Sequence, residues 1–168
     1  MPRIIVRYVR IIDEFNRRLG RITMYLIFAM IGVLMFSTIS KSFFNPSLWT
    51  LEVAQFLMVA YFLLGGAYSM QLSDHVRMDL LYGAWSPKTK AWVDAFTVFF
   101  LLTYLGVLLY GAFNSTTYSI QYQDRAPTAW RPYMWPIKSI MAFGILMMLL
   151  QTVSEFFKDV ARIRGKEL

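Results

Sequence analysis

Few side chains in this sequence could take part in chemistry, and they stand near the ends of apolar runs. Glu52 lies about one helical turn into such a run, where its carboxylate can pair with a cation of a neighbouring helix, face interfacial water, or contact a substrate or ion. His75 can titrate near neutral pH, or it can act as a capping or interfacial group at a helix end. Asp79 is expected to hold a loop together by accepting hydrogen bonds from backbone amides.

The same inventory excludes most catalytic classes. The chain has no cysteine and one histidine, so disulfides, thiolate metal sites and iron–sulfur clusters are excluded, and a bis-histidine haem cannot form within one copy. The centres of the apolar runs carry no charge, whereas a self-sufficient pump needs ionisable groups near the bilayer midplane. We therefore predict no catalytic residue, no metal ligand and no cofactor.

The composition predicts what kind of element holds these residues. Of 168 residues, 57% are apolar and 16% are charged, whereas roughly a quarter of the residues in a soluble domain are charged. The net charge is +7, but the cations flank the apolar runs, which argues against nucleic-acid binding. The sequence predicts an all-α membrane protein with a single membrane domain over residues 1–168.

Four apolar runs are each long enough for a transmembrane helix, which needs about 20 residues. We predict spans at about 22–40, 51–72, 91–116 and 135–154. Asn45-Pro46 predicts a tight turn after the first span, and Ser86-Pro87 predicts the capped start of the third helix. The third run stays uncharged as far as Gln123, so this helix tilts, protrudes or lies against protein at its end.

The N-terminal segment has a different pattern, with isoleucine, tyrosine and phenylalanine on one side and arginine on the other. Over residues 1–21 this pattern predicts an amphipathic helix that lies on the cytoplasmic membrane surface, with its arginines toward anionic lipid headgroups. The alternative is a helix packed against the flank of a partner protein.

The distribution of lysine and arginine predicts the orientation. One side carries thirteen cations: Arg3, Arg7, Arg10, Arg17, Arg18, Arg21, Arg77, Lys88, Lys90, Lys158, Arg162, Arg164 and Lys166. The other side carries four: Lys41, Arg125, Arg131 and Lys138. Because cytoplasmic loops are richer in cations, both termini are predicted to be cytoplasmic.

Small residues recur along the second span. Gly65, Ser69 and Ser73 are four residues apart and Gly66 stands beside them, a spacing that lets another helix backbone approach closely. We predict that this face and the region of Gly32 in the first span pack inside the bundle, and that Gly65, Gly66 and Ser69 belong to a helix interface. The alternative is a lipid-facing helix that contains two glycines.

Several short motifs occur in an order that covers nearly the whole chain. They are Trp49-x-x-Glu52, Gly65-Gly66-Ala67, His75-Val76-Arg77-Met78-Asp79, Pro127-x-x-Trp130-x-Pro132 and Gln151. Taken together and in this order, they resemble the small membrane subunit, the DctQ-like component, of tripartite ATP-independent periplasmic (TRAP) transporters.

The resemblance implies a function without catalysis. In that family a four-helix small subunit binds a large multi-span subunit, which carries the sodium and substrate sites and moves by an elevator mechanism. A periplasmic binding protein delivers the substrate, commonly an organic acid. This chain would then be an inner-membrane scaffold in bacteria, whose candidate interface residues are Glu52, Gly65, Gly66, Ser69, His75 and Asp79.

The resemblance also gives a role to two cations on the outer side. Arg125 and Arg131 flank a loop rich in proline and aromatic residues, and they become candidates for docking the binding protein. The alternative is that both arginines anchor the helix ends at lipid headgroups.

A second class of membrane protein has a similar size. Membrane-anchor subunits of respiratory or quinone-linked enzymes are small helical bundles, and many hold haem between two histidines on facing helices. This chain has only His75, which lies outside the predicted spans. A small exporter would need an ionisable residue deep inside a span, and the span centres of this sequence have no charged residue.

Overall fold

The computed structural model describes residues 3–72 and 86–163, and this part of the chain is helical throughout its regular structure. Its helices are α1 (Arg3–Met24), α2 (Leu26–Phe43), α3 (Thr50–Gln71), α5 (Pro87–Tyr122) and α6 (Trp135–Ile163). Four helical segments are long and apolar enough to cross a membrane, with α1 and α2 counted together as one segment. The predicted all-α class with four such segments is therefore confirmed, while the orientation and the surface position of the N-terminal helix stay predictions.

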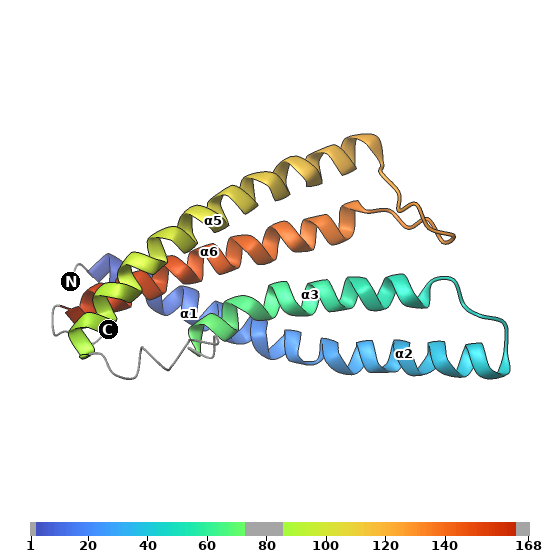
Figure 1. Ribbon diagram of the computed structural model, residues 1–168, viewed down its shortest axis with the longest axis horizontal. Helices are drawn as coiled ribbons and strands as arrows, with labels where there is room; N and C mark the ends of the chain where they lie inside the picture. The colour runs from blue at the N-terminus through green and yellow to red at the C-terminus, as the bar shows by residue number, and fades with distance from the viewer. Residues whose placement is uncertain (1–2, 73–85, 164–168) are drawn as a thin grey trace.

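The first two helices follow each other with one residue between them. The N–H of Tyr25 donates to the carbonyl of Ile22 at 3.0 Å, and the Tyr25 carbonyl accepts from Phe28 at 3.1 Å. These bonds join residues three apart, so the α-helical ladder tightens and breaks here. In Figure 1 α1 and α2 form one long blue element that bends at this point.

A short connection joins α2 to α3 and contains the predicted Asn45-Pro46 turn. α2 ends at Phe43, and the hydroxyl of Ser40 donates to the carbonyl of Asn45 at 2.9 Å. The buried hydroxyls of Thr50 and Ser37 form a hydrogen bond of 3.0 Å across the two helices. Because each hydroxyl finds a partner, these polar groups are buried at a low free-energy cost.

The predicted start of the third long helix is confirmed. The Ser86 hydroxyl accepts a hydrogen bond from the Thr89 amide at 3.4 Å, and proline occupies the first turn of α5. The helix then continues to Tyr122 and passes the predicted end of its span at residue 116. Thr116 and Thr117 donate their hydroxyl protons to the carbonyls of Ala112 and Phe113, so polar side chains there do not interrupt the helix.

The connection from α5 to α6 is ordered by backbone hydrogen bonds. Gln123 ends α5 in the left-handed conformation with φ 48°. Arg125 and Tyr133 then form an isolated antiparallel bridge, and the N–H of Met134 donates to the carbonyl of Asp124 at 3.0 Å. The loop therefore doubles back on itself before α6 begins.

The helices are arranged as an open row with α1 laid across one end (Figure 1). α5 packs chiefly against α6, α6 packs against α3, and α3 packs against α2, while α1 contacts α3 and α6. The α2–α3 hairpin and the α5–α6 hairpin meet near α1 and diverge toward their far ends. The described chain begins and ends at the same end of the row, as an even number of spans requires.

Candidate subunit interface

Two glycines set how closely the helices approach. A Cβ atom added at Gly144 of α6 would lie 2.9 Å from Leu63 Cβ and 3.1 Å from the Leu63 carbonyl carbon on α3. A Cβ atom added at Gly20 of α1 would lie 2.3 Å from Cγ of Tyr68. Real Cβ atoms do not come this close, so these helix contacts require glycine.

The small residues predicted on α3 take part in the same packing. A Cβ atom at Gly66 would lie 3.0 Å from the Met148 sulfur of α6, and one at Gly65 would lie 3.7 Å from Thr23 Cγ2 of α1. The expectation for Gly32 is wrong, because this residue is exposed on α2 and no heavy atom lies within 4 Å of its added Cβ. Helix α1 packs against α3 at Gly65 and Tyr68 and does not reach this part of α2. No other segment of the described chain covers Gly32.

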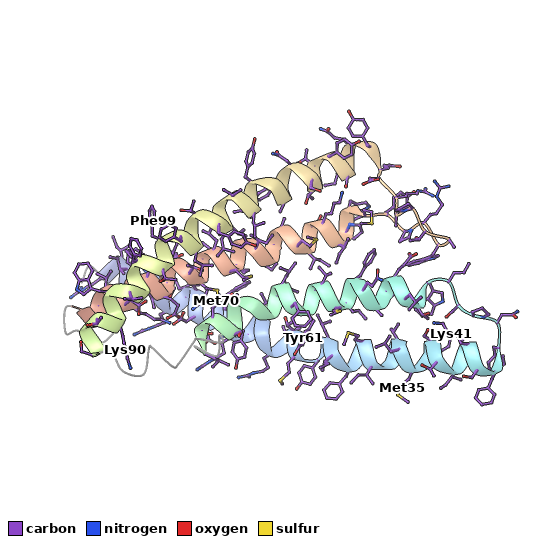
Figure 2. All side chains as sticks on the ribbon, viewed as in Figure 1. Met35, Lys41, Tyr61, Met70, Lys90 and Phe99 are labelled. Atoms are coloured by element: carbon purple, nitrogen blue, oxygen red, sulfur yellow. The ribbon has the colours of Figure 1, made fainter. Side chains whose placement is uncertain are left out.

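Beside these contacts lies an open, mainly apolar groove with a volume of about 530 Å³. Helices α1, α3 and α6 form its walls. Its lining includes Gly20, Thr23, Tyr61, Gly65, Gly66, Ser69 and Met148. Tyr61 is labelled on α3 in Figure 2. Gly65 and Gly66 therefore serve the packing within the chain, and together with Ser69 they line the open groove.

Glu52 lies in the first turn of α3 and is buried, with 9% of its surface exposed. The Glu52 side chain therefore has little contact with solvent in this structure. Its Oε2 atom is buried and has no hydrogen-bond partner in the part of the chain that the structure describes. The helix N-terminus favours a carboxylate at this position, but the free oxygen still lacks a donor.

The remaining predicted residues fall in two places. His75 and Asp79 lie outside the described residues. Arg125 and Arg131 are exposed in the loop between α5 and α6. The Arg125 guanidinium lies 4.3 Å from the centre of the Tyr133 ring and donates to the Tyr133 hydroxyl, whereas Arg131 has a left-handed backbone with φ 51°.

A buried polar cluster between α1 and α6 was not predicted from the sequence. Asn16 donates to Oε1 of Gln151 at 2.7 Å, and both side chains are almost completely buried. Gln151 in turn donates to Asp13 and Glu155, at 3.0 Å each. We call this set of residues, together with Lys158, the α1–α6 clamp.

Lys158 completes the clamp with charge. Its ammonium lies 2.7 Å from Asp13 and 2.8 Å from Glu155, and less than a quarter of each of these three side chains is exposed. Two acids and one lysine therefore share a partly buried network across α1 and α6. The one signal of the α1–α6 clamp in the sequence was Gln151, an uncharged polar residue inside an apolar run.

A second unpredicted polar contact lies at the other end of the row. The ammonium of Lys138 on α6 donates to the Ser119 hydroxyl of α5 at 2.5 Å and lies 3.4 Å from an Asp124 oxygen. The side chain of Ser119 is fully buried. This contact ties the start of α6 to the end of α5.

Within residues 3–72 and 86–163, no group of three or more acidic, histidine or cysteine side chains could hold a metal ion. The four helical segments that are long and apolar enough to cross a membrane indicate a multi-pass membrane component. The family model of the DctQ component of tripartite ATP-independent periplasmic transporters matches residues 30–162. The chain belongs to this family, as its motif order predicted.

Membership defines the setting of the chain in general terms. The DctQ component is part of a transporter and works with a large membrane subunit, DctM, and with a substrate-binding protein. Together with the four apolar helical segments, this indicates a multi-pass protein of the inner membrane. No curated protein matches the chain.

Proposed function

We propose that this chain is the non-catalytic small subunit that scaffolds the large, substrate-translocating subunit of a sodium-coupled transporter for an organic acid or a related small solute. A periplasmic binding protein would deliver the substrate, and both termini would lie in the cytoplasm. The family membership supports the class of transporter. The uncharged centres of the spans support a role for this chain in assembly, with sodium and substrate bound by the large subunit.

The observation that carries the proposal is how little apolar surface the chain buries within itself. Only 6% of the most apolar stretch of α5 is buried, compared with 39% for α6. Phe99, labelled on the outer side of α5 in Figure 2, is 64% exposed. A flat row of helices leaves two broad faces for lipid or protein, and a scaffold needs one of them for its partner.

Two features of α3 suggest where the large subunit contacts this chain. The groove along Gly65, Gly66 and Ser69 is shaped for a helix, since small residues let a backbone approach. The buried carboxylate of Glu52 has an oxygen without a donor, which a cation or an N–H group of the large subunit would satisfy. We assign both features to the subunit interface.

Co-purification from native membranes in mild detergent tests this assignment. We expect the tagged chain to carry along one multi-span protein much larger than itself. Gly65→Leu, which fills the groove, should reduce the recovery of that protein. Gly65→Ala should not, because the added methyl group meets Thr23 at an ordinary 3.7 Å.

Gly32→Leu is the matched control, since Gly32 stands in open space on α2. Recovery of the chain alone, or with a soluble subunit that contains haem or flavin, would overturn the proposal and favour a respiratory membrane anchor. A reduced-minus-oxidised absorption spectrum of the purified material distinguishes these outcomes.

The docking of the binding protein is tested separately at the α5–α6 loop. We expect the double variant Arg125→Gln with Arg131→Asn to lower the transport rate at limiting binding protein, and salt to weaken the wild-type interaction. Lys41→Gln, in the other outer segment, is the control. An unchanged rate in the double variant would mean that both arginines only anchor the loop at headgroups.

A further inference from the structure

A second pocket, different from the groove, lies where α3 ends beside α1 and α6. It has a volume of about 330 Å³, near the lower limit of the about 300–1,000 Å³ typical of small-molecule sites. One face of α1 forms most of its wall, because the residues that line it are three or four positions apart. These are Val6, Val9, Arg10, Asp13, Glu14 and Arg17. Gln71 of α3 and Lys158 of α6 close the pocket.

Most charges in this wall already have partners. Asp13 pairs with Lys158 at 2.7 Å, and Glu14 pairs with Arg18 at 2.8 Å. Arg10 and Arg17 are exposed, and neither has an ion-pair partner in the residues that the structure describes. They lie seven residues apart on one face, so their Cα atoms are about 10 Å apart along the helix. The pocket therefore offers two free guanidinium groups to an anion.

Gln71 gives the pocket a second recognition element. Its Oε1 atom is buried and has no hydrogen-bond donor among the described residues. A buried acceptor without a donor is rare in folded proteins and calls for a ligand or a water molecule. A ligand that satisfies the whole pocket must present an anionic group to the arginines and an N–H or O–H group to Gln71.

We propose that this pocket binds the headgroup of a membrane phospholipid. The phosphodiester would lie between Arg10 and Arg17, and an ammonium or hydroxyl of the headgroup would donate to Gln71. The depth agrees with this assignment, because α3 ends at Gln71 after a run long enough to span the bilayer. Val6 and Val9 provide apolar wall beside the polar groups. The site does not depend on the large subunit.

Lipid chemistry gives a sharp test of the second contact. Phosphatidylethanolamine and phosphatidylcholine are both zwitterionic phosphodiesters, but only the ethanolamine headgroup has a hydrogen-bond donor. Phosphatidylglycerol has hydroxyl donors and a net negative charge. Native mass spectrometry of the delipidated full-length chain, with each lipid added back at equal acyl length, measures the three affinities. We expect the ethanolamine lipid to bind about two- to tenfold more tightly than the choline lipid, the effect of one hydrogen bond. The glycerol lipid should bind more tightly still, because its net negative charge adds to the attraction by Arg10 and Arg17.

Three variants separate the contributions. Gln71→Leu should abolish the preference for ethanolamine lipid over choline lipid, while Arg10→Gln with Arg17→Gln should weaken the binding of all three lipids. Arg21→Gln is the control, because this exposed arginine on α1 is not part of the pocket wall. Circular dichroism and a monodisperse elution profile verify that each variant is folded.

Several results would overturn the proposal. Equal binding of ethanolamine and choline lipid by the wild type, or an unchanged preference in Gln71→Leu, would remove the role of Gln71. Displacement of the lipids by free phosphoethanolamine at similar concentration would assign the pocket to a soluble phosphate ester. Loss of lipid binding when the large subunit joins the complex would assign the pocket to an acidic segment of that protein.

Discussion

At Gly144 the space for a side chain is already taken by Leu63, and the cost of filling it can be measured. We expect Gly144→Ala to lower the stability by about 1–3 kcal/mol, because the methyl group would meet the Leu63 backbone at 3.1 Å and force α6 away from α3. The apparent Tm of the purified chain in detergent measures the loss.

Gly111 on α5 is the matched control, since nothing lies within 4 Å of a Cβ atom added there. Gly111→Ala should leave the Tm unchanged or raise it, because alanine stabilises an exposed helix by up to about 1 kcal/mol relative to glycine. Equal effects of the two substitutions would contradict the close packing of α3 and α6.

The α1–α6 clamp leads to a second prediction at the same scale. Gln151→Leu should lower the stability by about 1–3 kcal/mol, because it leaves the amide of Asn16 buried without an acceptor. The double variant with Asn16→Leu should cost less than the sum of the two single variants, since both lose the same hydrogen bond. Thermal unfolding of the four proteins gives the coupling.

The sequence could indicate the type of packing residue but not its partner. Gly65 and Gly66 were predicted at a helix interface from their spacing, and Gly66 does meet Met148 of α6. The prediction for Gly32 was wrong, because the sequence pattern around a glycine in an apolar run is the same whether or not another helix covers it. The bond between Asn16 and Gln151 joins residues 135 positions apart, and one sequence holds no local signal for such a pair.

At the scale of elements, the loop between α5 and α6 combines a left-handed residue with an ordered backbone. Arg131 has φ 51°, a conformation that asparagine tolerates and β-branched residues do not. We expect Arg131→Val to destabilise the chain by about 1–2 kcal/mol relative to Arg131→Asn. Both variants lose the charge, so the difference in Tm between them reports the backbone alone. Equal Tm values would mean that the loop adopts another conformation in the membrane.

Helix boundaries were predictable where local chemistry sets them. Ser86 and Pro87 begin α5 because the serine hydroxyl and the proline ring favour a helix start in any context. At the far end of α5 the uncharged run as far as Gln123 predicted a helix longer than one span, and α5 does continue to Tyr122 past the polar residues near 116. In the structure their hydroxyls bond to carbonyls one turn back, and the helix continues.

At the scale of the whole molecule, the predicted orientation is directly testable because the chain has no cysteine. A single Thr128→Cys in the α5–α6 loop should react with a membrane-impermeant maleimide once the outer membrane is permeabilised. A single Arg7→Cys in α1 should react only after the inner membrane is broken. The opposite labelling pattern would reverse the orientation.

The order of the helices in the row could not be derived from the sequence. All four spans are apolar on most faces, so the pattern did not reveal that α6 lies between α3 and α5 or that α5 is so exposed. The short connection at Asn45 predicted that α2 and α3 are neighbours. The arrangement of the two hairpins depends on contacts such as Gly144 with Leu63, which form only between distant segments.

The break at Tyr25 fixes a depth in the bilayer. Here the N–H groups of Tyr25 and Phe28 bond to carbonyls three residues back, and the interruption between α1 and α2 creates helix ends whose peptide groups lack regular helical partners. An unpaired peptide group in hydrocarbon costs several kcal/mol, because no water is there to solvate it. We therefore expect Tyr25 to lie among hydrated headgroups. The 18 residues of α2 then cover about 27 Å, close to the about 30 Å of a hydrocarbon core, and α1 keeps its arginines in water.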